Sequence, residues 1–201
     1  MNEQFYDKLL NIRTCEEQKR FYKSFHYHPY EPTPYSALET LFNQYEVTSS
    51  DQIVDFGCGK GRLNFFIEHL FQATVIGIEM NNIFYEEALV NLEGYVRKKK
   101  NSRERIHFYN CLAEEYKIGS KDNRFYFFNP FSIQIFRKVI NNILCSVEHA
   151  QRKVNLILYY PSEDYIYFLE KDTSFELKQE VRLGVKYEQN PSERFLIYEL
   201  K

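Results

Sequence analysis

The sequence predicts an α/β fold built on a doubly wound, mostly parallel sheet. Two observations carry this prediction: short apolar runs alternate with helical segments from residue 51 onward, and the first of those runs ends in a glycine-rich turn before a helix. The chain has 201 residues, enough for one domain with a substantial core. We therefore expect one compact domain, with residues 1–48 as an N-terminal helical lid and residues 49–201 as the α/β part.

The N-terminal part is expected to form helices on both sides of a proline-rich stretch. Apolar residues near helical spacing predict a helix over residues 3–23. The prolines within residues 26–34 cannot continue it, because proline lacks an amide donor and pushes the preceding residue toward extended geometry. Thr33 is then expected to cap a second helix that begins at Pro34.

Seven apolar runs predict the strands of the sheet. Parallel strands are expected at residues 53–56, 74–79, 106–109, 125–128 and 154–160, and crossover helices at 63–71, 84–96 and 131–147. The fourth and fifth strands are almost wholly apolar or aromatic, as strands covered on both faces must be. Residues 175–183 and 195–200, joined through Gly184 and a turn at 190–192, predict a C-terminal antiparallel hairpin.

Composition limits the class of protein. Hydrophobic residues make up 44% and charged residues 27%, which is typical of a globular chain, and a formal net charge of −2 is unlike that of a protein that binds nucleic acid through its whole surface. Without an apolar run long enough to span a bilayer or a secretory start, the chain is expected to be cytoplasmic, with no membrane partner. Its scattered cysteines predict free thiols.

The turn after the first strand is the most informative segment. The strand carries Asp55 and runs into the alternate glycines Gly57, Gly59 and Gly61 directly before a helix. Such glycines let the backbone turn sharply and approach a ligand, and the helix start offers free amides. The fingerprint of a nicotinamide-cofactor site needs a glycine where Arg62 stands, and it does not explain a buried acid. An ammonium group on the ligand would compensate that acid.

The segment resembles the first motif, D-x-G-x-G-x-G, of the class I S-adenosylmethionine-dependent methyltransferases. The resemblance implies a seven-stranded sheet with helices on both faces, and S-adenosylmethionine as the cofactor. It also implies that this loop cradles the methionine end of the cofactor. The loop residues expected to bind it are Asp55, Gly57, Cys58, Gly59 and Gly61.

The ends of the second and third strands are also expected at the cofactor. The resemblance implies that Glu79, followed by Met80, binds the ribose hydroxyls, and a carboxylate with two acceptor oxygens suits a vicinal diol. The alternative is a surface Glu after a strand. Asn110 or Cys111 would contact the adenine amine and Leu112 its ring face. Capping of a helix by Asn110 explains that segment almost as well, and the acid usual in the family is absent there.

The end of the fourth strand carries the candidate acceptor residues Asn129, Pro130 and Phe131. They are similar to the N-P-P-[FY] signature of methyltransferases that act on planar amines and amides, although one proline is missing. The resemblance implies that Asn129 and the Pro130 carbonyl accept hydrogen bonds from the target nitrogen while the aromatic ring stacks on it. The alternative is a turn in which Asn129 caps the next helix and Pro130 starts it.

The expected function is methyl transfer from S-adenosylmethionine to a small-molecule acceptor, because the cofactor domain uses most of the chain. One alternative is an amine or amide nitrogen in RNA or protein, suggested by the strand-four tip and by the basic run 97–105, which otherwise reads as a solvated loop. Another is a non-catalytic cofactor-binding regulator. A protonated acceptor would need a base, for which His26, His28 or a lid tyrosine is a candidate. No pattern of metal ligands is present, so no metal is expected.

Overall fold

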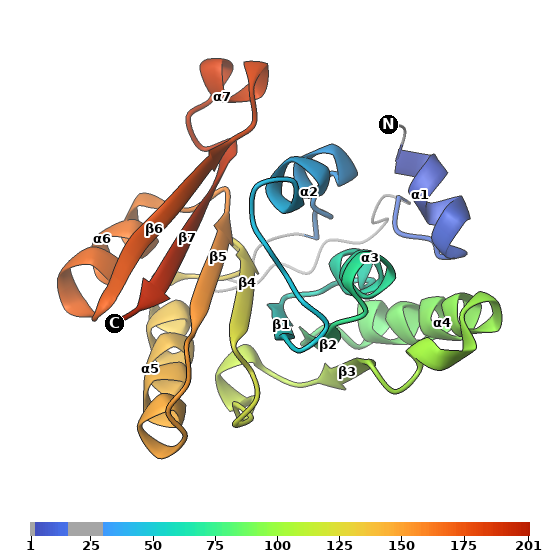
Figure 1. The fold of residues 1–201 in the computed structure, drawn as a ribbon, viewed down its shortest axis with the longest axis horizontal. Coiled ribbons are helices and arrows are strands. Elements are labelled where there is room, and N and C mark those ends of the chain that lie inside the picture. The colour runs from blue at the N-terminus through green and yellow to red at the C-terminus, as the bar shows by residue number, and fades with distance from the viewer. Residues whose placement is uncertain (1–2, 16–29) are drawn as a thin grey trace.

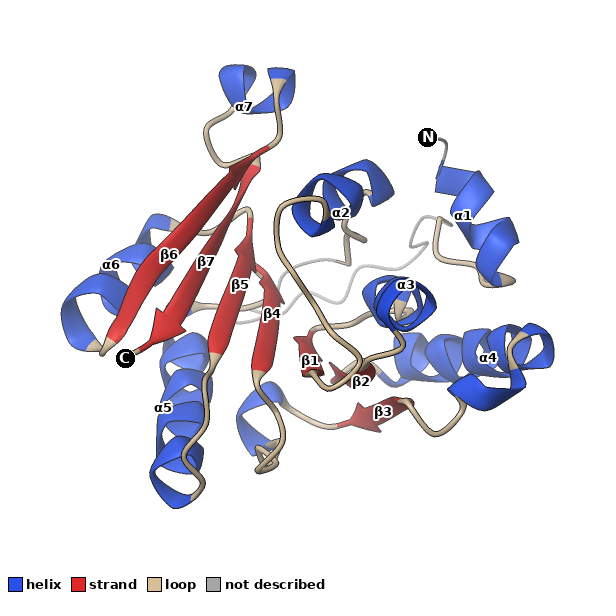
Figure 2. Cartoon of the chain, viewed as in Figure 1, coloured by secondary structure: helices blue, strands red, loops and turns tan. Residues whose placement is uncertain are grey.

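The computed structural model describes residues 3–15 and 30–201 (Figure 1). Its centre is a seven-stranded sheet in the order β3-β2-β1-β4-β5-β7-β6 (Figure 2). β7 runs antiparallel to its neighbours β5 and β6, and the other pairs are parallel. The fold class predicted from the sequence, including the C-terminal antiparallel hairpin, is confirmed. The strands are β1 (Gln52–Phe56), β2 (Thr74–Glu79), β3 (Ile106–Asn110), β4 (Arg124–Phe128), β5 (Asn155–Tyr159), β6 (Phe175–Arg182) and β7 (Arg194–Leu200).

Helices cover both faces of this sheet. One face packs against α1 to α4 and the other against α5 and α6. Alternate residues of β4 enter opposite cores, since Tyr126 lies in the first cluster and Phe125 and Phe127 lie in the second. The helices are α1 (Glu3–Leu10), α2 (Tyr35–Phe42), α3 (Arg62–Phe71), α4 (Asn82–Lys98), α5 (Ile133–His149), α6 (Glu163–Asp172) and α7 (Val185–Gln189), with short 3₁₀ turns η1 (Lys100–Ser102) and η2 (Ala113–Glu115).

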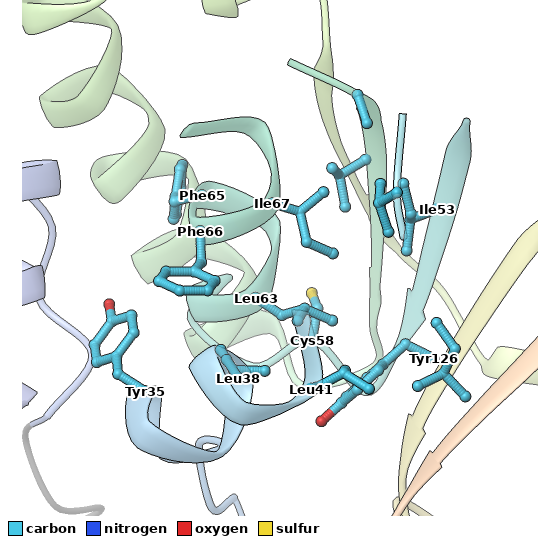
Figure 3. Packing of buried hydrophobic residues seen from close by; sticks show 14 of the residues in the cluster. Tyr35, Leu38, Leu41, Ile53, Cys58, Leu63, Phe65, Phe66, Ile67 and Tyr126 are labelled. Carbon is cyan, nitrogen blue, oxygen red and sulfur yellow. The ribbon is translucent and has the colours of Figure 1, made fainter. Parts of the chain in front are cut away.

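The helix α2 lies over the centre of the first core. Figure 3 shows its residues Leu38 and Leu41 in one cluster with Leu63 and Phe66 of α3. All four side chains are at most 4% exposed, so the residues before β1 are an integral part of this core. The part of the chain assigned to a lid therefore also supplies packing that the sheet needs.

The structure corrects two expectations for the N-terminal part. The first helix ends at Leu10, where Asn11 takes a left-handed backbone conformation (φ 57°), instead of continuing along the chain. Thr33 does not cap the second helix, which begins at Tyr35; its hydroxyl instead forms a 2.7 Å hydrogen bond with that of Tyr126. Residues 16–23 of the predicted helix, and the candidate bases His26 and His28, lie outside the described residues.

The C-terminal part contains two helices that the sequence reading omits. α6 follows β5 and begins after Ser162, whose hydroxyl accepts the amide of Tyr165 (3.4 Å). α7 occupies part of the predicted hairpin turn and begins after Gly184, which has a positive φ of 53°. The turn itself is confirmed, because the Asn190 side chain accepts the amide of Ser192. Among the described residues, no helix combines the length and apolarity that crossing a membrane requires.

Part of the basic run 97–105 contacts the protein itself, although Arg97, Lys98, Lys100 and Arg103 are exposed. Glu68 of α3 has a fully buried side chain that accepts two hydrogen bonds from Arg105 and one from the Tyr95 hydroxyl (2.5 Å), and it pairs with Lys99 (3.4 Å). Burial opposes the charge of Glu68, but these contacts outweigh it and lower the pKa of the carboxyl. The nearby Lys98 donates to backbone carbonyls at the end of α1. The expectation of a solvated run holds for the exposed residues and is wrong for Lys99 and Arg105, which are half-buried beside Glu68.

Replacing Glu68 by Ala should lower the free energy of unfolding by roughly 2–4 kcal/mol, because Arg105 and Lys99 lose their buried partner but can still reach water. Glu93→Ala is the matched control: the pair of Glu93 with Arg103 is exposed, so its loss should cost less than about 1 kcal/mol. Urea unfolding followed by circular dichroism measures both values. Equal losses for the two variants would contradict a structural role for Glu68.

Candidate functional site

The carboxyl ends of four parallel strands meet at one edge of the sheet. β1 pairs with β2 and β4, and β4 pairs with β5, in registers that place the residues after Phe56, Ile78 and Phe127 beside one another. The glycine loop, Glu79, Asn129 and the residues after Tyr159 therefore lie along the same edge. In open α/β sheets ligands bind at this edge, where the strand order changes direction. Here the chain runs from β1 outward to β2 and β3, and then returns to place β4 on the other side of β1.

The glycine loop requires its glycines. Gly57 and Gly59 have φ values of 81° and 53°, which side chains with a Cβ rarely adopt. A Cβ on Gly57 would lie 2.8 Å from the Pro130 Cβ, and one on Gly59 would lie 2.1 Å from the Tyr30 ring. The loop is thus in close contact with the strand-four tip on one side and with the N-terminal segment on the other.

Glu79 joins the end of β2 to the glycine loop. Its side chain is 7% exposed, and its oxygens accept the amides of Gly59 (2.9 Å) and Asn81 (2.7 Å). The reading of Glu79 as a surface residue is therefore wrong. Burial raises the pKa of this carboxyl, and the surrounding backbone amides oppose the rise. A carboxylate has about four lone-pair positions, so acceptor capacity remains beyond these two amides.

Asp55 lies beneath the same loop, 4% exposed. Asn64 of α3, with its amide oriented to satisfy both neighbours, donates to Asp55 Oδ2 (3.0 Å) and accepts the amide of Gly77 (3.2 Å). Burial, and then the negative charge of Glu79, raise the pKa of Asp55 to about 8. The sequence reading missed Asn64, although a polar residue between Leu63 and Phe65 on the inward side of a helix was a usable signal.

The other residues predicted at the cofactor differ in their placement. Cys58 is buried, and a Cβ added to Gly77 would lie 2.6 Å from its sulfur, so the thiol packs into the sheet and burial raises its pKa. Met80 is 37% exposed at the strand edge.

Asn110 donates to the Glu79 carbonyl (2.8 Å). It is not a helix cap, because Leu112 precedes η2, so that alternative is wrong. Cys111 and Leu112 are half-buried.

The strand-four tip has an unusual backbone. Asn129 has a φ of 39°, in the left-handed region, and Pro130 packs on the glycine loop. α5 begins three residues after Pro130, with Ser132 before it, so the reading of Asn129 as a helix cap is wrong. The side chain of Phe131 is 1% exposed and its ring contacts Phe127 in the core. A stacking role for Phe131 therefore has no support from its position.

Aromatic residues at the end of β5, absent from the candidates drawn from the sequence, lie beside Asn129 in the strand register. The ring of Phe128 lies 4.5 Å from that of Tyr159, whose hydroxyl donates to Glu193 (2.7 Å). Tyr160 follows with a left-handed backbone, and its hydroxyl accepts from the Asn190 side chain (2.7 Å). Their signal in the sequence was the pair of tyrosines that ends an apolar run.

Arg62 ties the N-terminal segment to the glycine loop. It is the first residue of α3, 5% exposed, and it donates to the Thr14 hydroxyl (2.8 Å) and the Thr33 carbonyl (3.2 Å) while forming an ion pair with Glu3. Its guanidinium also lies over the Tyr35 ring, 4.6 Å from the centroid. The position that would be glycine in a nicotinamide site thus holds a cation that anchors residues before β1. Among the residues with described side chains, no group of three His, Cys, Asp or Glu could hold a metal ion.

The raised pKa of Asp55 predicts a pH dependence of stability. The folded protein holds the Asp55 proton up to about pH 8, whereas the unfolded chain releases it near about pH 4. Between these values the folded state binds more protons, so the free energy of unfolding falls as the pH rises. Asp55→Asn removes this loss, and should therefore gain stability relative to the parent between pH 5 and pH 8 in urea unfolding. An identical difference at the two pH values would show that Asp55 is ionised in the fold; exposed Asp172→Asn is the control.

Comparisons with known proteins agree with this geometry. No family model matches the chain. A protein-lysine N-methyltransferase of Saccharolobus islandicus is 33% identical over 66 residues, which are 32% of this chain and 41% of that protein, so the match spans about two fifths of the relative's length.

Two solved structures have the same architecture over most of the chain. An RNA methyltransferase from Salinibacter ruber, in complex with S-adenosyl-L-homocysteine, is 16% identical with a TM-score of 0.55, over 85% of this chain and 92% of the other. The human methyltransferase 10 domain containing protein is 10% identical with a TM-score of 0.64, over 98% of this chain and 93% of the other. The chain has the Rossmann-like fold of the class I S-adenosylmethionine-dependent methyltransferases.

Proposed function

We propose that the protein is an S-adenosylmethionine-dependent methyltransferase that positions its acceptor at the end of β4. The observation that carries the proposal is the hydrogen bond from the Gly59 amide to Glu79, because it brings together the two motifs that the sequence resemblance assigns to the cofactor. A glycine turn alone would serve many ligands. A turn whose amide is bound by a buried acid at the end of the next strand is a narrower arrangement.

The residues present fit this cofactor. The left-handed backbone of Gly57, Gly59 and Gly61 lets the loop turn sharply at the end of β1, and the Tyr30 ring packs on Gly59 where the proposed lid meets the loop. Glu79 offers acceptor positions to a ribose diol. The buried Asp55 carboxyl lies beneath the same loop, where a ligand ammonium group would lower its raised pKa and favour the ionised form. When bound, the cofactor supplies an electrophilic methyl group. The protein's own part is to align the acceptor and exclude water.

The N-terminal segment is proposed to cover the methionine end of the cofactor. Tyr30 lies against Gly59 and donates to the Thr14 carbonyl (3.2 Å), and its ring is 4.8 Å from that of Phe84. Arg62 anchors the same segment from below. These contacts support a lid over the glycine loop, formed by the chain before β1.

The acceptor is proposed to be a small molecule or a protein amine. The match to a protein-lysine N-methyltransferase supports an amine. An RNA acceptor has less support, because Lys99, Arg103 and Arg105 of the basic run pair with glutamates of the protein itself. A regulator that binds the cofactor without catalysis differs in one measurable respect, since it would release no methylated product.

Replacing Glu79 by Ala should weaken binding of S-adenosylhomocysteine about tenfold to a hundredfold, because a charge-assisted contact of about 1.5 to 3 kcal/mol is lost. Calorimetry on the parent, Glu79→Ala and the exposed control Glu93→Ala measures this. Folded parent protein that binds neither S-adenosylmethionine nor S-adenosylhomocysteine would overturn the proposed function. Unchanged affinity in Glu79→Ala would exclude Glu79 from the site.

Asn129→Gly should lower kcat by roughly tenfold to a hundredfold with cofactor affinity nearly unchanged, since the contact is with the reacting group. Glycine is preferred to alanine here because it accepts the left-handed backbone of residue 129. Turnover with labelled cofactor and calorimetry with S-adenosylhomocysteine are compared on the same samples. A parallel loss of affinity and turnover would indicate that Asn129 maintains the loop and does not orient the acceptor.

A further inference from the structure

Aromatic residues gather at the acceptor side of the site. Phe128, Tyr159 and Tyr160 follow one another at the ends of β4 and β5, next to Asn129 in register. The Tyr159 ring lies 4.5 Å from Phe128 and 6.3 Å from Tyr160. Phe128 and Tyr160 are only partly buried, so their rings are within reach of a ligand at this edge. Aromatic faces attract organic cations.

A carboxylate contacts one of these rings. Glu193, directly before β7, accepts the Tyr159 hydroxyl (2.7 Å), and after burial this contact raises the pKa of Tyr159. Within the described residues, Glu193 forms no ion pair with Lys or Arg. Of the cations in the same hairpin, Arg182 and Arg194 both pair with Glu180 (2.8 Å each), Lys178 pairs with Glu199, and the exposed Lys186 lies on α7.

We propose that the methyl acceptor is a primary alkylamine that this surface recognises as an alkylammonium ion, with Glu193 as its counter-charge and the rings of Phe128 and Tyr160 around its carbon chain. This inference rests on the proposed function and names the substrate class of the same site. Carboxylates and aromatic faces both favour a cation, whereas they disfavour the phosphates of a nucleic acid. A lysine side chain and a free diamine share this chemistry.

Methyl transfer to such an amine conserves atoms and charge. The ammonium ion releases one proton to solvent, and the nitrogen lone pair forms a bond to the methyl carbon as the carbon–sulfur bond breaks. The bonding pair stays on sulfur, which leaves as the neutral thioether of S-adenosylhomocysteine. The product carries its positive charge on nitrogen as a methylammonium ion, which the Glu193 carboxylate still accommodates.

The test uses the full chain with labelled S-adenosylmethionine and four acceptors: 1,5-diaminopentane, a short peptide with one lysine, 1,5-pentanediol and a short RNA. Label should enter one or both amines and neither of the others. In Glu193→Gln the KM for the amine should rise about tenfold while kcat stays within about twofold. Glu188→Gln, an exposed change on α7 in the same hairpin, removes the same charge away from Tyr159 and should leave KM unchanged.

A binding measurement keeps the two proposals separate. Saturation-transfer NMR on protein loaded with S-adenosylhomocysteine should detect the amine and not the diol, and Glu193→Gln should weaken the signal. Label in the diol or RNA alone, an amine KM unaffected by Glu193→Gln, or loaded protein that neither binds nor methylates an amine would overturn the inference and leave cofactor binding intact. Failure of the parent to bind S-adenosylhomocysteine would overturn the proposed function itself. A peptide preferred over the diamine identifies protein lysine as the source of the amine.

Discussion

The site depends on two buried carboxylates held under one glycine turn. Asp55 and Glu79 come from neighbouring strands. Burial opposes the ionisation of both, and the charge of Glu79 adds to the cost for Asp55. The fold compensates with the Gly59 and Asn81 amides and the Asn64 side chain. Such an arrangement is unfavourable for stability alone, since apolar residues would fill the same space at lower cost. Its value lies in the polar, backbone-lined surface that it presents at the strand ends.

The fold was predictable because its signals are local. A strand covered on both faces has to be apolar, and a crossover helix has to carry an apolar face, so the order of strands and helices from β1 to α5 follows from periodicity. α6 was missed because only three of its residues, Tyr165, Phe168 and Leu169, face the core, and because its start depends on the Ser162 cap. The end of the first helix was missed because it depends on one residue, Asn11, in a left-handed conformation.

The site was predictable to a smaller extent. Glu79 could be placed because it is the last residue of the strand that follows the glycine loop in the sequence. Its hydrogen bond with the Gly59 amide is a tertiary contact, which the sequence does not reveal. Phe131 was assigned by its neighbours in the chain, whereas the helix that follows turns its ring into the core. Tyr159 and Glu193 come together through the reversed strand β7, and no spacing in the sequence encodes that pairing. The same limit applied to the basic run, whose partner Glu68 lies on another helix.

The packing of Pro130 on Gly57 links the two halves of the edge. Because both are backbone-determined positions in close contact, the end of β4 cannot slide relative to the glycine turn without a steric clash. The line along which an acceptor approaches is then a property of the main chain, while the chemistry that selects the acceptor belongs to side chains at the ends of β5 and β7. Substitutions there could alter the choice of acceptor without misaligning the reaction, so the scaffold separates the geometry of transfer from the specificity of the substrate.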